Sequence, residues 1–259
     1  MSLNTQTVNK IEQIEGHLSR NEGLFLHSLI SHNVKDPSIV EIGSWQGRST
    51  AWLSTALQNE NSNGQVYAVD HGIGDPEAGI LNTKDIFVNN MKRLSLDKYV
   101  THIFKRSEDA LTEWTKDINI LFIDGGHDYV DVKKDIQWEK YLVEGGLIAF
   151  HDVLNPAEGP VRIVIERIIN SSNFSDFGTA DSIFFARKIT KGKKQRKIQR
   201  KILTFLLRMS LWLTLKDRTI SKRSYKKRLI RIIMKRSLRR CISLITRPWD
   251  RIKRSQIKS

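Results

Sequence analysis

The sequence predicts an α/β fold in which helices cover both faces of a mostly parallel sheet, followed by a basic helical extension. Short apolar runs alternate with helical patterns of about 10–15 residues between positions 39 and 188, which is typical of doubly wound sheets. The charge then changes abruptly. Residues 187–259 hold 27 of the 43 Lys and Arg residues and two acidic residues, a net charge of +25, whereas the preceding residues carry −10.

Runs of Val, Ile and Phe mark the strands, and apolar residues recurring at i, i+3 and i+4 mark the helices. Strands are expected at 39–43, 65–70, 100–104, 118–124 and 146–152, with a closing pair at 174–177 and 182–188. Helices are expected at 8–31, 47–58, 83–95, 107–115, 130–141 and 159–170. A polar loop, 71–82, follows the second strand. Such units place ligands beyond the carboxyl ends of the strands.

Composition indicates a protein made and kept in the cytoplasm. The single cysteine, Cys241, excludes an intrachain disulfide, and the polar N-terminus lacks the apolar core of a secretory signal. The longest apolar stretch, 202–215, has 14 residues and includes Arg208. It is shorter than the roughly 20 residues of a spanning helix, so any membrane attachment would be peripheral, on the inner face of the plasma membrane.

The segment IVEIGSWQGRST at 39–50 predicts a cofactor loop. It ends a strand with two glycines four residues apart, Gly43 and Gly47, and then opens a helix. The spacing differs from the G-x-G-x-x-G that holds a pyrophosphate, which favours S-adenosylmethionine over a dinucleotide. Ser44 lies inside this loop. The alternative is that a tight strand-to-helix turn requires the glycines.

Polar residues follow each of the other strands. Asp70 ends the second strand, where a carboxylate can accept both hydroxyls of a ribose. Ser107 and Glu108 follow the third strand and are placed to border an adenine ring. For Ser107 a helix cap is the alternative.

Ionisable groups gather after the fourth and fifth strands, in DGGHD at 124–128 and HD at 151–152. Asp124 and Asp152, with His151 beside them, could hold a divalent cation such as Mg²⁺ through carboxylate oxygens. His127 lies three residues past Asp124 and suits a general base, since imidazole titrates near neutral pH. The alternative is that His151 and Asp152 pair with each other or cap the next helix.

Three motifs together resemble a class I S-adenosylmethionine-dependent methyltransferase, in the group with a later H-D-V motif. They stand here as IVEIGSWQGRST, FIDGGHDYVDVKKDI and EGGLIAFHDV. The resemblance implies a Rossmann-like, seven-stranded sheet whose last hairpin is antiparallel. It assigns Glu41, Gly43, Asp70 and Glu108 to the cofactor, and we group Ser44, Gly47, Ser107 and Asp124 with them.

Metal-dependent O-methyltransferases of the catechol and macrolide-sugar types share this body. In the catechol type an Asp after strand four and an Asp-Asn pair after strand five bind the metal, where this chain has Asp124 and His151-Asp152. The catalytic lysine of that type corresponds to His127. His151 departs from the pattern, because imidazole is a softer ligand than Mg²⁺ prefers. Members of the H-D-V group often act in the synthesis of surface polysaccharides.

The extension, 189–259, allows three interpretations. Residues 190–201 form a basic run, 202–215 are apolar, and 222–245 place apolar residues at helical spacing among Lys and Arg. This composition is typical of an interfacial helix on an anionic membrane. The helices could instead pack on the body or on a second copy of the chain. Nucleic acid is the third alternative, although the extension contains no RNP1 or GXXG motif.

The sequence therefore predicts a methyltransferase domain at 1–188 and a basic amphipathic extension at 189–259. The predicted activity is methylation of a hydroxyl on a sugar, glycan or glycosylated metabolite, with His127 as base and 71–82 as a lid over the acceptor. Two alternatives remain open. One is an RNA methyltransferase that uses the basic tail, and the other is a non-catalytic, membrane-associated scaffold that binds the cofactor.

Overall fold

The chain is described by a computed structural model that covers residues 3–30, 35–75, 79–189, 197–218, 234, 236–242 and 244–248. It divides into two compact units. The first comprises Met1–Gly126 with Lys134–Ile148, and the second comprises His127–Lys133 with Ala149–Ser259.

The first unit contains most of the parallel strands. They are β1 (Ser38–Ile42), β2 (Gln65–Val69), β5 (Val100–Ile103), β6 (Ile118–Ile123) and β7 (Leu142–Phe150), whose last two residues belong to the second unit. A small antiparallel pair, β3 (Gly74–Asp75) and β4 (Ile80–Leu81), lies within the expected loop. The helices are α1 (Thr5–Glu12), α2 (Arg20–Ser28), α3 (Arg48–Asn59), α4 (Thr83–Arg93) and α5 (Ser107–Thr112), with 3₁₀ turns η1 (Asp97–Tyr99) and η2 (Ile136–Tyr141).

The second unit continues through the end of the chain. It contains most of α6 (Tyr129–Asp135), then α7 (Glu158–Ile163) and the π-helix η3 (Val164–Ile169). The strands β8 (Phe174–Ala180) and β9 (Ile183–Lys188) follow, and the extension contributes α8 (Lys197–Arg218) and the short β10 (Arg247–Pro248).

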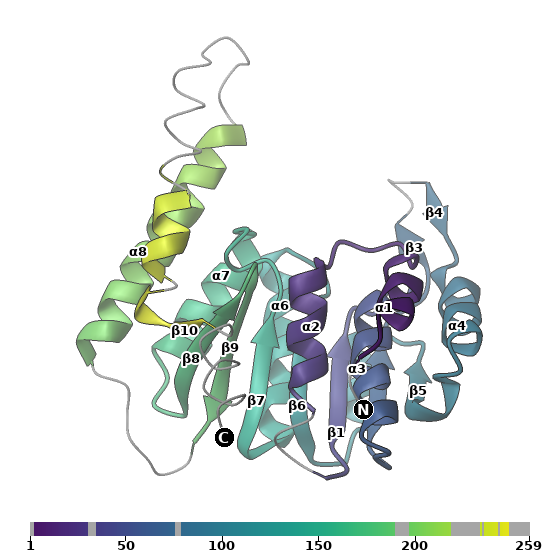
Figure 1. Ribbon diagram of the computed structural model, residues 1–259. Coiled ribbons are helices and arrows are strands. Elements are labelled where there is room, and N and C mark those ends of the chain that lie inside the picture. The colour runs from purple at the N-terminus through teal and green to yellow at the C-terminus, as the bar shows by residue number, and fades with distance from the viewer. Residues whose placement is uncertain are drawn as a thin grey trace. The chain divides into compact units, whose positions relative to one another are not determined.

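The sheet has the strand order β10-β8-β9-β7-β6-β1-β2-β5 (Figure 1). Strand β1 pairs in parallel with β2 and β6, β2 pairs in parallel with β5, and β8 pairs antiparallel with β9. Apart from the two-residue β10, these are the seven strands and the antiparallel last hairpin that the resemblance implies. The predicted α/β fold class is confirmed.

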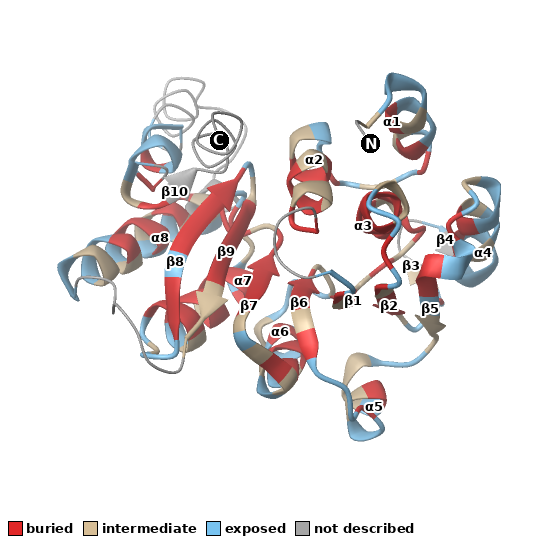
Figure 2. Ribbon diagram, turned by 60° about the horizontal axis from the view of Figure 1, so that its bottom comes forward, coloured by how far each residue is buried: buried red, intermediate tan, exposed pale blue. Residues whose placement is uncertain are grey.

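Helices cover the central strands of the first unit on two sides, so most residues of these strands are apolar. Figure 2 shows α2 and α3 on one side of β6, β1 and β2, with α5 on the other. Ile39, Val40, Leu121 and Phe122 are all fully buried, as expected for strands with no solvent-facing side. Helices α2 and α3 approach closely at Gly23, where a Cβ atom would lie 2.2 Å from the ring of Trp52.

The N-terminal helical stretch is interrupted, which differs from the single segment expected at 8–31. Helix α1 ends at Glu12 and α2 begins after Ser19. The Ser19 side chain accepts from the Glu22 amide while the Glu22 side chain accepts from the Ser19 amide, so a complete capping box starts a second helix.

The described part of the extension packs within the second unit. Leu203, Leu207 and Leu213 of α8 are buried, and α8 contacts both α7 and η3. Arg200 fastens the start of the helix by donating to the carbonyls of Ile169, Ser171 and Phe174. This packing is one of the three interpretations left open by the sequence.

The rest of the described extension also meets the body. Strand β10 pairs in parallel with β8, and the hydroxyls of Thr179 and Thr246 lie 3.3 Å apart in a buried position. Much of the amphipathic pattern at 222–245 lies outside the described residues. No helix in the described ranges is both long and apolar enough to cross a membrane. The boundary after Lys188 stays a prediction.

Candidate active site

The loop between β1 and α3 takes a conformation that demands its glycines. Gly43 has φ +85°, and a Cβ atom there would lie 2.3 Å from the backbone oxygen of Asp124, at the end of β6. Gly47 has φ +93° and caps α3, where a Cβ atom would meet the Met91 side chain at 2.7 Å. Both glycines therefore have a local structural reason in addition to the predicted approach of a cofactor. Ser44, between them, is buried.

Asp70 follows β2 and is fixed in place by backbone donors. One carboxylate oxygen, Oδ2, accepts from the Trp45 amide at 2.9 Å, and Oδ1 accepts from the Gly72 amide at 2.7 Å. Its side chain keeps 15% of its exposure. Each carboxylate oxygen has a second lone pair, so the carboxylate is oriented and can still accept the two hydroxyls of a ribose. This arrangement fits the predicted role of Asp70.

Glu41 lies inside β1 and is fully buried. One carboxyl oxygen, Oε2, accepts from the Thr50 hydroxyl on α3, while Oε1 has no hydrogen-bond partner among the described residues. Burial raises the pKa of Glu41 to about 8, against the opposing effect of the Ser49 and Thr50 hydroxyls, and nearby Asp124 and Asp70 add to the rise. The hydrogen bond between Thr50 and Glu41 therefore joins α3 to β1, the two elements on either side of the cofactor loop.

Ser107 and Glu108 begin α5, the helix that follows β5. The Ser107 hydroxyl donates to Oδ1 of Asp135, and Glu108 accepts from Lys134 Nζ at 2.7 Å. The hydrogen bond from Lys134 lowers the pKa of Glu108 below its ordinary value. Glu108 is thus an ionised hydrogen-bond acceptor. Such an acceptor fits the predicted position of Glu108 at the border of the adenine ring.

Asp135 is a residue that the sequence did not single out. Its side chain is buried, it accepts from Ser107, and a Cβ atom on Gly125 would lie 3.1 Å from its Oδ2. Asp124 lies at the end of β6, where its amide donates to the Ile42 carbonyl at 2.8 Å. Nothing in VDVKKD distinguishes Asp135 from the exposed Asp131, so only the fold reveals it.

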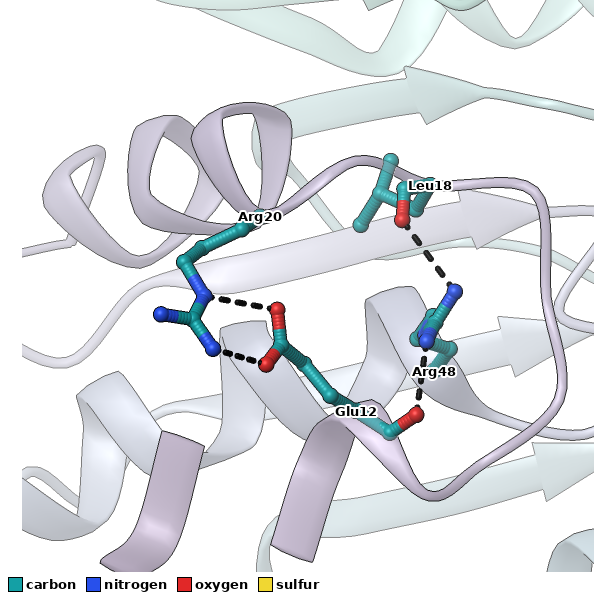
Figure 3. A network of polar contacts seen from close by, with 4 residues as sticks. All are labelled: Glu12, Leu18, Arg20 and Arg48. Atoms are coloured by element: carbon teal, nitrogen blue, oxygen red, sulfur yellow. Dashed lines mark hydrogen bonds and ion pairs between the residues drawn. The ribbon is translucent and has the colours of Figure 1, made fainter. Parts of the chain in front are cut away.

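The loop between α1 and α2 is fastened to the start of α3 by Arg48 (Figure 3). The Arg48 guanidinium donates to the carbonyls of Gly16 at 2.6 Å, Leu18 at 3.3 Å and Glu12 at 2.7 Å. The Glu12 carboxylate in turn pairs with Arg20, at the first turn of α2. Arg48 is the residue directly after Gly47, so the N-terminal segment is tied to the cofactor loop.

Two further contacts join the same elements. The His17 ring stacks on the Trp45 ring with a centroid distance of 5.7 Å, and Gln46 Nε2 donates to Glu15 at 3.1 Å. Trp45 itself has φ +43°, an uncommon value for a residue other than glycine. The N-terminal loop therefore covers residues 44–48, a relation that the sequence analysis did not predict.

The second unit contains the predicted acid–base residues as a cluster around Asp152. Nε2 of His127 lies 3.0 Å from Asp152 Oδ2, and Nδ1 of His151 lies 3.3 Å from the same oxygen. His127 is 56% exposed, whereas His151 is 5% exposed. Burial alone would raise the pKa of Asp152, but the hydrogen bonds and charges of the two histidines hold it well below its usual range. Asp152 is therefore an anion placed to orient His127.

The backbone conformation positions the residues of this cluster. Asp152 has φ +54°, and its carbonyl accepts from the Ala157 amide at 3.0 Å, which closes the turn after β7. The Gly159 amide donates to the His127 carbonyl at 3.0 Å, and a Cβ atom on Gly159 would lie 2.5 Å from that oxygen. The glycine thus allows α7 to hold the His127 backbone beside the turn.

The Asp152 carboxylate also reaches the extension. Asn155 Nδ2 lies 3.4 Å from Asp152 Oδ1, and Arg239 donates to Asn155 Oδ1 at 3.3 Å. Arg239 belongs to the helical segment 236–242. A chain of polar contacts therefore runs from the extension to the carboxylate that orients His127.

The metal site predicted from Asp124, His151 and Asp152 stays a prediction. No group of three or more His, Cys, Asp or Glu side chains in the described ranges is arranged to hold a metal ion. The oxygen of Asp152 that would bind a cation is paired with His127 and His151. The contact between His151 and Asp152 is the pair that the sequence offered as the alternative to a metal site.

Comparison with known proteins is consistent with this architecture. The O-methyltransferase TomG from Streptomyces achromogenes, involved in tomaymycin synthesis and solved with S-adenosylmethionine, superposes with a TM-score of 0.56 at 17% identity, over 72% of this chain and 91% of that one. The O-methyltransferase of Bacillus cereus, solved with S-adenosylhomocysteine, gives 0.55 at 22% identity, over 72% and 92%. At these identities the likeness is one of fold.

Sequence comparison adds one relative and one family model. The curated protein y4gI of Sinorhizobium fredii is 26% identical over 125 residues, which span 47% of this chain and 14% of that protein. A family model described as a methyltransferase domain matches residues 40–153, the range that contains the cofactor loop, Asp70 and the Asp152 cluster. Residues 40–153 therefore match a methyltransferase domain, in a chain whose fold is shared with O-methyltransferases solved with S-adenosylmethionine or S-adenosylhomocysteine.

Proposed function

We propose that the protein methylates a hydroxyl group of a sugar, glycan or glycosylated metabolite, with His127 as the general base. The observation that carries this proposal is the His127–Asp152 pair, with 3.0 Å between Nε2 and Oδ2. A histidine oriented by an anionic carboxylate is the arrangement that removes a proton from a weakly acidic hydroxyl. The O-methyltransferases that share the fold agree with an oxygen acceptor.

The cofactor would be held by the first unit. The backbone of residues 43–47 would approach it, Asp70 would accept the ribose hydroxyls, and Ser107 and Glu108 would border the adenine. When bound, S-adenosylmethionine supplies an electrophilic methyl group whose C–S bond breaks as the acceptor's O–C bond forms. The chain's own contribution is then to orient the acceptor and to receive one proton.

His127 can receive that proton at a defined atom. Because Asp152 accepts a hydrogen bond from Nε2–H, the neutral tautomer presents Nδ1 as the proton acceptor. Proton transfer makes the imidazole cationic, and the Asp152 anion stabilises that charge. The loop 71–82 is proposed as the acceptor lid, and its described residues include the β3–β4 pair.

The test is methyl transfer from labelled S-adenosylmethionine to cell extracts separated into glycan, lipid-linked, RNA and small-molecule pools. Label is expected in a glycan or glycosylated pool. His127→Ala is expected to lower the rate by about 10²–10⁴-fold, with cofactor binding by calorimetry unchanged. Asp128→Ala, at the neighbouring exposed position, is the matched control.

Other outcomes decide against the proposal. Label in RNA would establish the basic tail as an RNA-binding arm, and a biological output unaffected by His127→Ala would indicate a non-catalytic scaffold. Addition of EDTA is a separate experiment. Loss of turnover on chelation would support a divalent cation in the reaction. The glycan acceptor and the cytoplasmic location stay predictions.

A further inference from the structure

Helix α8 carries two apolar surfaces, of which one is buried and the other is exposed. The inner surface is formed by Leu203, Leu207 and Leu213, which are buried, and the helix contacts α7 and η3. The second surface is exposed, and Figure 2 shows buried and exposed residues alternating along the helix. We call it the outer stripe, and it consists of Ile198, Ile202, Phe205 and Trp212.

The outer stripe is continuous. Its members recur at i, i+4, i+7 and i+14, so at 3.6 residues per turn they fall on one line along about 20 Å of helix. Phe205 is 60% exposed, Ile198 is 65% exposed and Trp212 is 51% exposed. Large apolar side chains lined up in this way mark an interaction surface rather than scattered surface residues.

A basic row lies beside the outer stripe. Lys197, Lys201 and Arg208 are exposed and recur at i, i+4 and i+11, on the side of the stripe away from the buried face. The chain has no acidic residue between Arg187 and Lys216. The partner must therefore offer hydrocarbon and negative charge together.

This requirement distinguishes the partners. A second copy of the chain that met the outer stripe about a two-fold axis would set one basic row near the other. Nucleic acid offers phosphates but no hydrocarbon for Ile198, Ile202 and Phe205. An anionic lipid surface offers both, with headgroup phosphates for the basic row and the acyl boundary for the stripe.

We propose that the outer stripe of α8 is a membrane-docking surface, so that the helix lies along an anionic bilayer while its inner face holds the enzyme. The apolar and basic residues share one rigid helix that Arg200 fastens to the second unit through three backbone carbonyls. The methyltransferase would then work at the surface where lipid-linked acceptors are found. The docking is separate from the chemistry, so a soluble acceptor would be methylated without vesicles.

The test is flotation of the full chain with vesicles of phosphatidylcholine, with and without phosphatidylglycerol. The variant Phe205→Gln/Trp212→Gln is expected to bind the anionic vesicles at least about tenfold more weakly, because it removes two aromatic side chains from the stripe. Val130→Gln is the control, since Val130 is 63% exposed on α6, away from α8. The wild type is expected to bind the anionic vesicles and not the neutral ones.

Tryptophan fluorescence gives a second measurement. Quenching by brominated lipids is expected in the wild type and is expected to be smaller in Trp212→Phe, which keeps an aromatic ring on the stripe and so keeps vesicle binding. Equal flotation of the double variant and the wild type would overturn the proposal. So would a dimer that the double variant dissociates in the absence of vesicle binding, or a melting temperature lowered by several degrees, since that would show the stripe to be covered by protein.

Discussion

The two units each contain a carboxyl group withdrawn from water, and their environments push the pKa values in opposite directions. In the first unit, burial raises the pKa of Glu41 to about 8, so it is mostly neutral at pH 7. In the second, His127 and His151 hold the pKa of Asp152 well below its usual range, so it is an anion. Glu41 meets hydroxyls, whereas Asp152 meets two imidazoles that can be charged.

The difference agrees with the proposal that the first unit binds the cofactor and that the second supplies the base. The cofactor loop is held by glycine conformations, by hydrogen bonds from Arg48 to backbone carbonyls, and by backbone amides that donate to Asp70. The Asp152 cluster is held by groups that exchange protons. A catalytic centre needs the second kind of environment, and a site for a reactive cofactor is served by the first.

Removal of residues 189–259 is expected to have the largest effect and to fall on the second unit alone. It takes away the buried leucines Leu203, Leu206, Leu207 and Leu213, each worth about 1.5–3 kcal/mol when fully buried. Chemical unfolding should show a loss of more than about 5 kcal/mol in that unit. Removal of 249–259 is the control, and an unchanged midpoint after the larger truncation would establish 1–188 as an independent domain.

Glu41→Gln removes the buried carboxyl group whose pKa is raised in the first unit. Because its pKa is raised in the folded state, the stability that Glu41 contributes is present at low pH and is lost as the pH rises through about 8. Gln does not titrate, so the variant should gain about 2–3 kcal/mol relative to the wild type between pH 6 and pH 9. Urea unfolding measures this, with Glu60→Gln at an exposed position of the same unit as control.

The second unit should respond to pH with the opposite sign. The pKa of Asp152 is lowered by folding, so its contribution is present above the ordinary range of an aspartate and is lost as the pH falls below it. Acid unfolding of Asp152→Asn should therefore be less steep than that of the wild type. If the two proteins show the same dependence of unfolding on acid pH, the contacts of Asp152 with His127 and His151 do not stabilise the fold.

Asp70→Ala tests the binding region directly. It removes the acceptor of the Trp45 and Gly72 amides and of the predicted ribose contacts, so the affinity for S-adenosylmethionine should fall by about 1–3 kcal/mol. Calorimetry measures this loss of affinity. Binding of NAD in place of S-adenosylmethionine would contradict the assignment of the loop.

Arg239→Gln should give the smallest effect, because the contact it breaks is exposed. Loss of the hydrogen bond to Asn155 should lower the methylation rate by about two- to fivefold, the equivalent of about 0.5–1 kcal/mol, and shift the pH–rate profile, with cofactor binding unchanged. Arg240→Gln removes the same charge one position along and serves as control. If the two variants behave alike, only the net charge of the extension matters.

The sequence by itself determined the alternation of strands and helices and the placing of Asp70, Asp124, His127 and Asp152 at strand ends. Those features depend on local patterns, namely the apolar period and the residues that end each run, and local patterns can be read from one chain. The cofactor loop was predictable for the same reason, since Gly43 and Gly47 are four residues apart.

Only the tertiary structure decided which residues meet across the chain. Arg48 reaches Gly16 and Leu18, and Asp135 reaches Ser107, although no local pattern distinguishes Arg48 or Asp135 from similar residues nearby. Asp152 accepts from both His127 and His151, which the sequence placed only at neighbouring strand ends. The extension looked like a free basic tail because its charge is local information, whereas the surface that buries Leu203 and Leu207 is formed by α7 and η3, more than thirty residues earlier. Burial and side-chain contacts both depend on the packing of distant segments. Burial keeps Glu41 mostly neutral, whereas contact with His127 and His151 keeps Asp152 ionised in spite of its burial.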